Sequence, residues 1–86
     1  MAVNVAARLK SLNPLTSTGP STRASIIEIS HSGMRVRSNR HFQVGTLVHI
    51  ITPGTFYLGT IRHCSPAGEA FEVGIKLTER IPSSLV

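Results

Sequence analysis

Apolar and polar residues alternate along several short stretches of this chain. The clearest stretch is Gly33–Arg37, in which Met34 and Val36 alternate with Arg35 and Arg37. Successive side chains on a strand point to opposite faces, so this pattern is typical of a strand with one buried and one solvated face. We predict a strand here, with both arginines pointing to solvent.

Two hairpins are predicted after this strand. Leu47–Ile51 is rich in apolar and β-branched residues, and Thr52-Pro53-Gly54 has the composition of a turn. Alternation resumes over Thr55–His63, which completes the first hairpin. Cys64–Gly68 then predicts another turn, because it contains both Pro and Gly. Ala70–Leu77 completes the second hairpin, and its apolar positions alternate: Phe71, Val73, Ile75 and Leu77.

The pattern in the first third of the chain does not assign its secondary structure as clearly. Val3–Leu12 has apolar residues at helical spacing and also alternates like a strand, so its period leaves both possibilities open. Asn13–Thr22 is small and polar and contains two prolines, which predicts a loop. Arg23–Ile29 is rich in Ile and is predicted to be a strand.

Short β-rich runs separated by turn signals, without a long helix, predict an all-β fold, either a small antiparallel barrel or a sandwich. The chain has 86 residues. Folding units seldom fall below about 50 residues, so we expect a single domain over residues 1–86. A domain of this size has little room for a deep catalytic cleft, which favours a binding module over an enzyme.

Composition adds a preference for anionic partners. Hydrophobic residues make up 41% of the chain and charged residues 15%, so the chain has enough apolar material to fold. Lys and Arg outnumber the acids by nine to four, which gives a net charge of +5, and seven of the nine cations are Arg. The guanidinium group makes two parallel bonds to a phosphate or a guanine edge, so this bias suits phosphate or base recognition.

The sequence shows no catalytic or metal-binding constellation. Ser30 and His31 are neighbours, so on a strand they point to opposite faces, and the chain contains no Asp to orient an imidazole. The four histidines and Cys64 are not spaced as metal ligands, and the glutamates lie on separate segments. We therefore expect no enzyme activity, no metal and no bound cofactor.

The single cysteine, Cys64, cannot form an internal disulfide, and the chain does not start with a signal-peptide pattern. No apolar run approaches the roughly 20 residues that a membrane helix needs. We expect a cytoplasmic protein without a membrane span.

The stretch from Ile26 to Val36 contains a short motif between two predicted strands. Glu28, Ser30 and Gly33 are spaced like the signature of the PilZ family, an acidic or amide residue, then Ser, then Gly, and the chain resembles that family here. The resemblance continues through Gly45–Val48 and through the predicted second hairpin. It covers about Arg23–Leu77.

This resemblance implies a six-stranded antiparallel barrel and a bacterial signalling module that binds cyclic di-GMP. PilZ domains use an Arg-x-x-x-Arg motif at the head of the first strand together with the second motif. This chain lacks that pair before residue 23, and its nearest matches involve Asn4 and Arg8. The ligand-binding residues carried over are Asn4, Arg8, Glu28, Ser30 and Gly33. Glu28 stands where the family has a shorter side chain, which moves the carboxylate outward by one methylene.

Three alternatives stay open at this point. Ser30 and Gly33 would also suit a simple turn, with Gly33 at positive φ. The face formed by Arg35, Arg37 and Arg40 would suit a nucleotide-independent adaptor that recognises an acidic effector protein. The same face could bind nucleic acid, but three Phe, one Tyr and no Trp leave few platforms for stacking bases.

Overall fold

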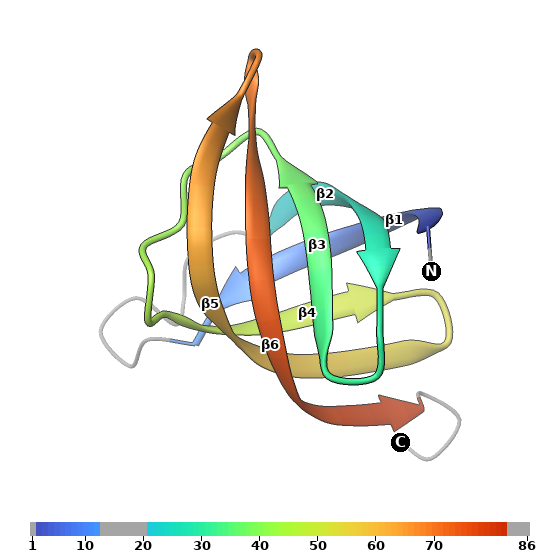
Figure 1. The fold of residues 1–86 in the computed structure, drawn as a ribbon. Coiled ribbons are helices and arrows are strands. Elements are labelled where there is room, and N and C mark those ends of the chain that lie inside the picture. Colours follow the sequence, from blue (N-terminus) through green and yellow to red (C-terminus); the bar gives the residue numbers. More distant parts are fainter. Residues whose placement is uncertain (1, 13–20, 83–86) are drawn as a thin grey trace.

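The structure, a computed structural model, describes residues 2–12 and 21–82, which form six antiparallel strands (Figure 1). The strands are β1 (Ala2–Ser11), β2 (Thr22–Ile29), β3 (Gly33–Ser38), β4 (Leu47–Thr52), β5 (Thr55–Ala67) and β6 (Ala70–Pro82). They close into a barrel in the order β1-β2-β3-β6-β5-β4, with β1 and β4 paired at the closure. The all-β antiparallel barrel is thereby confirmed. Most of the predicted loop, residues 13–20, lies outside the described residues.

The segment whose period left helix and strand open is strand β1. Ala7 and Leu9 are buried, whereas Arg8 between them is exposed. Leu9 pairs with Thr22 of β2 on one side and with Ile50 of β4 on the other. Both backbone edges of this part of β1 therefore find hydrogen-bonding partners in neighbouring strands, and this tertiary pairing decides between the two patterns.

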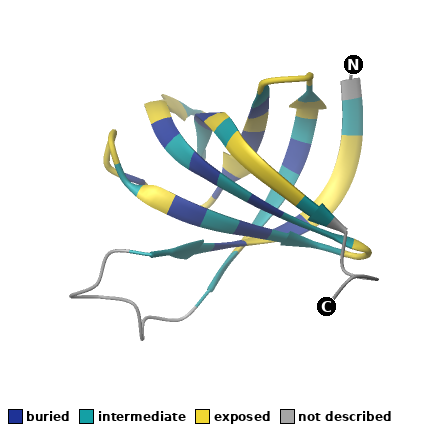
Figure 2. Cartoon of the chain, turned by 90° about the horizontal axis from the view of Figure 1, so that it is seen from below, coloured by how far each residue is buried: buried dark blue, intermediate teal, exposed yellow. Residues whose placement is uncertain are grey.

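Buried residues alternate with more exposed ones along the strands, as the burial colours in Figure 2 show, because alternate side chains of a strand point into the barrel. Met34 and Val36 are buried while Arg35 and Arg37 are exposed, which confirms the prediction for β3. The hydrophobic core draws on all six strands and on the β3–β4 connection, and its buried members are Ala7, Leu9, Ile26, Met34, Val36, Phe42, Val48, Ile50, Tyr57, Ile61, Val73 and Ile75.

The second hairpin is longer than the sequence predicted. A turn was expected over Cys64–Gly68, but β5 continues to Ala67 and the turn falls at Gly68-Glu69, where Gly68 has φ of 66°. Pro66 is tolerated in this strand because the pairing of β4 with β5 ends at Thr60, so beyond it Pro66 removes no ladder hydrogen bond to β4. β6 likewise runs past Leu77 to Pro82.

Gly59 lies in β5 next to a register shift between Leu58 and Gly59 in the pairing with β6, and an irregularity of this kind bends a strand. A Cβ atom at Gly59 would come within 2.6 Å of Ile75 Cγ2 and 2.7 Å of the Lys76 carbonyl oxygen. The carbonyl belongs to the backbone of β6 and cannot move aside alone. The bend therefore depends on a residue without a side chain.

We expect Gly59→Ala to lower the free energy of unfolding by about 1–3 kcal/mol, because β6 must shift to admit the methyl group. Urea denaturation measures the loss. Gly33→Ala is the matched control, since a Cβ atom there meets nothing closer than the Ile75 carbonyl oxygen at 3.4 Å. Equal losses in the two variants would contradict this account of the bend.

Candidate functional site

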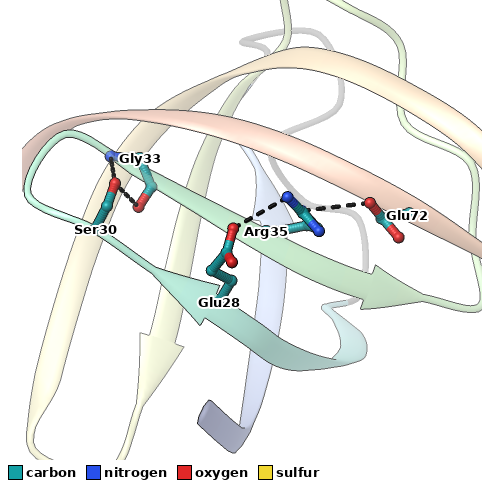
Figure 3. Close-up of polar contacts among 5 residues, drawn as sticks. All are labelled: Glu28, Ser30, Gly33, Arg35 and Glu72. Atoms are coloured by element: carbon teal, nitrogen blue, oxygen red, sulfur yellow. Dashed lines mark hydrogen bonds and ion pairs between the residues drawn. The ribbon is translucent and has the colours of Figure 1, made fainter. Parts of the chain in front are cut away.

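The turn between β2 and β3 carries the motif residues Ser30 and Gly33 (Figure 3). The Ser30 backbone N–H donates to the Gly33 carbonyl oxygen at 2.9 Å. The Gly33 N–H donates to Ser30 Oγ at 3.2 Å, and that hydroxyl donates to the Gly33 carbonyl oxygen at 3.3 Å. Ser30 therefore fixes the shape of the turn, as the turn interpretation of the motif expected.

The turn interpretation also predicted a positive φ for Gly33, and this part of it is wrong. The positive-φ glycines of the described residues are Gly45, Gly54 and Gly68, and Gly33 begins β3 with ordinary strand geometry. The space beside it would admit a Cβ atom in ordinary van der Waals contact. The fold therefore does not require glycine here, and what glycine provides is a half-buried stretch of backbone that carries no side chain.

Glu28 is held by Arg35, its cross-strand partner on β3. Arg35 Nη2 lies 3.1 Å from Glu28 Oε1, and Arg35 Nε lies 3.4 Å from Glu72 Oε1 on β6, as Figure 3 shows. One guanidinium group thus joins two carboxylates across three strands. The side chains of Glu28 and Arg35 are about half exposed, so solvent weakens these ion pairs and leaves them open to competition.

This arrangement changes the basic face proposed from the sequence. Arg35 is already paired with two acids. The adaptor alternative relied on Arg35, Arg37 and Arg40. Of these, Arg37 and Arg40 are exposed and have no carboxylate partner among the described residues. The sequence pattern showed the exposure of Arg35 and could not show its partners.

A surface hollow of about 410 Å³ lies beside the turn. Glu28, Ser30 and Gly33 all line it, so the structure brings these three predicted residues together. Its other cationic residues are Arg35, Arg62 and Lys76. Sequence reasoning had assigned Arg35 to the basic face and had missed Arg62 and Lys76. Lys76 reaches the hollow because it pairs with Gly33 across β3 and β6. A register between strands this far apart in the chain leaves no local sequence signal.

His63 completes one side of the hollow. Its imidazole ring lies against Gly74, and a Cβ atom at Gly74 would collide with the ring. Gly74 is buried although it belongs to the outward-facing set of β6 positions, because His63 covers it. Gly74 therefore allows His63 to lie flat against β6 at the edge of the hollow.

The remaining two predicted residues are placed differently. Arg8 pairs with Arg23, which lies five positions along β2 from Glu28, or about 17 Å of strand. Arg8 does not line the hollow, and its Nη1 lies 3.4 Å from Ser21 Oγ. Asn4 is exposed on β1, between the residues that pair with Glu28 and Ile26. The roles of Asn4 and Arg8 in ligand binding stay predictions.

The described residues contain no group of three or more His, Cys, Asp or Glu side chains that could hold a metal ion. Within the same residues there is no helix that could span a membrane.

Comparison with known families gives one match. The family model described as PilZ domain matches residues 4–85, nearly the whole chain. The matched range includes the β2–β3 turn and the final hairpin, and it begins well before Arg23, where the resemblance in individual residues began. A search of curated proteins finds no match.

We expect Arg35→Gln to lower the free energy of unfolding by up to about 1 kcal/mol at low salt, because Glu28 and Glu72 lose their shared cation. The difference should shrink at high salt, where exposed ion pairs are screened. Urea denaturation at two salt concentrations measures both effects. Arg37→Gln on the same strand is the control and should cost much less; a similar loss there would contradict the ion-pair explanation.

Proposed function

The chain belongs to the PilZ domain family, and on that premise we propose that it is a bacterial signalling module that binds cyclic di-GMP in the hollow beside Ser30 and Gly33. PilZ domains are binding and adaptor modules rather than enzymes, and we propose the same for this chain. The observation that carries the proposal is the gathering of Glu28, Ser30 and Gly33 with several cations around one hollow.

The positive charge of the hollow suits the phosphates of the ligand. The chain lacks the family's Arg-x-x-x-Arg pair before residue 23. Arg62 of β5 and Lys76 of β6 are exposed, line the hollow, and have no carboxylate partner among the described residues. We assign to them the phosphate contacts, since charge-assisted hydrogen bonds to phosphate are among the stronger polar contacts in proteins.

The other rim of the hollow suits a guanine base. Glu28 uses Oε1 for Arg35, and its second carboxylate oxygen can accept hydrogen bonds from guanine nitrogens. Gly33 lets a ring approach the strand closely, because no Cβ atom stands in the way. The volume of about 410 Å³ is within the range of small-molecule sites.

We expect isothermal titration calorimetry to show saturable binding of cyclic di-GMP at micromolar concentration, about −8 kcal/mol, with GMP binding much more weakly. Gly33→Ala should weaken the affinity about tenfold or more, because the methyl group covers the backbone that the base approaches. Its urea denaturation should match the wild type, which separates binding from folding. Arg62→Ala should also weaken binding, and Arg40→Ala, outside the hollow, should not.

The same titration distinguishes the two sets of candidate residues. If the hollow is the site, Arg8→Ala keeps the wild-type affinity, because Arg8 lies on a different part of the barrel. A large loss with Arg8→Ala and none with Arg62→Ala would favour the set carried over from the family motif. No heat with a folded wild-type protein would make the cyclic di-GMP proposal wrong.

A further inference from the structure

Another face of the barrel carries three exposed arginines, Arg8 of β1, Arg23 of β2 and Arg37 of β3, that do not line the hollow. Arg8 and Arg23 are direct cross-strand partners. Arg37 is the partner of Ser25, two positions along β2 from Arg23, so it occupies the diagonal position. The register of three neighbouring strands thus gathers three cations from distant parts of the sequence.

Small side chains between these arginines leave a groove. Ala6 pairs with Ser25, which pairs in turn with Arg37, so two short side chains occupy the middle of the row. The groove has a volume of about 650 Å³, and Ile51 and Pro53 line it beside β1. Among the described residues, its lining contains the three arginines and no acid.

The charges in this groove are uncompensated. Like charges directly opposite each other on neighbouring strands are destabilising, and Arg8 and Arg23 are such a pair. Among the described residues, none of the three arginines has a carboxylate within ion-pair distance, in contrast to Arg35. Glu72 is the β6 partner of Arg37, but its carboxylate pairs with Arg35 instead. An anion in the groove would relieve the repulsion among the three arginines.

We propose that this groove, formed by Arg8, Arg23 and Arg37, binds an extended acidic segment of a partner protein. Carboxylates at alternate positions of an extended chain lie about 7 Å apart. Diagonal cross-strand positions, such as those of Arg23 and Arg37, are separated by about 7–8 Å. The guanidinium fork binds carboxylates with two parallel hydrogen bonds, so spacing and chemistry both match.

Two further observations restrict which kind of molecule can occupy the groove. No aromatic side chain of the described residues lines the groove, so a nucleic-acid strand would find no platform on which to stack its bases. The four acidic residues of the chain are Glu28, Glu69, Glu72 and Glu79, and no two of them lie at alternate positions, so the sequence has no segment with the charge pattern proposed for the ligand. We therefore assign the acidic segment to a partner protein. This site and the cyclic di-GMP hollow have no lining residue in common.

The test is a titration of the full chain with a capped hexapeptide of alternating Glu and Ser, followed by NMR amide shifts. We expect saturable shifts at Ala6, Ser25 and the three arginines, with little change at Ser30 and Gly33. Arg23→Glu should weaken binding at least tenfold. The same variant should raise the urea midpoint, because the introduced carboxylate would pair with Arg8 instead of repelling it, so a loss of binding cannot be attributed to unfolding.

Arg40→Glu is the matched control, because it makes the same change in net charge outside the groove. It should leave peptide affinity within about twofold. Equal weakening by the two variants would overturn the groove assignment in favour of diffuse attraction to the protein's positive charge. Tighter binding of a single-stranded thymidine hexamer than of the peptide would overturn the choice of partner. No shifts at these residues would reject the site.

Discussion

The double pairing of β1, with β2 on one side and β4 on the other, is the constraint from which the surface of this protein follows. Closing the sheet removes the free edges at β1 and β4 and fixes which outward side chains become neighbours. Arg8, for example, is placed between Arg23 and Ile51 by these two registers. A helix over the same residues would leave Arg23 without this neighbour, and the arginine groove would not exist.

Much of the fold was predictable because one face of most strands is buried. Met34 and Val36 alternate with arginines, and the alternation is preserved wherever the inner face must be apolar. β1 was ambiguous because alanines, which are small enough for either pattern, occupy its middle. The end of β5 was misplaced because Pro66 was taken as a turn residue, although the strand has no neighbouring strand on its outer side there.

The candidate site, like the fold, was predictable from the sequence only in part. Glu28, Ser30 and Gly33 lie within one hairpin, so their proximity could be predicted from sequence spacing. Arg62 and Lys76 join them through pairing between segments more than twenty residues apart in the chain, which no local pattern encodes. The separation of Arg8 from Glu28 has the same origin, because it depends on the register of β1 against β2. Local motifs therefore predicted part of the site, and long-range register determined the rest.

The two long strands of the final hairpin extend beyond their outer neighbours. Pairing of β5 with β4 ends at Thr60, and pairing of β6 with β3 ends at Lys76, so each strand continues with one edge that no described strand covers. Such edges are where β proteins join one another and aggregate. Each uncovered stretch contains a proline, Pro66 in β5 and Pro82 at the end of β6. Proline has no N–H to offer an incoming strand, and proline on an edge is one of the devices by which β proteins discourage edge-to-edge pairing.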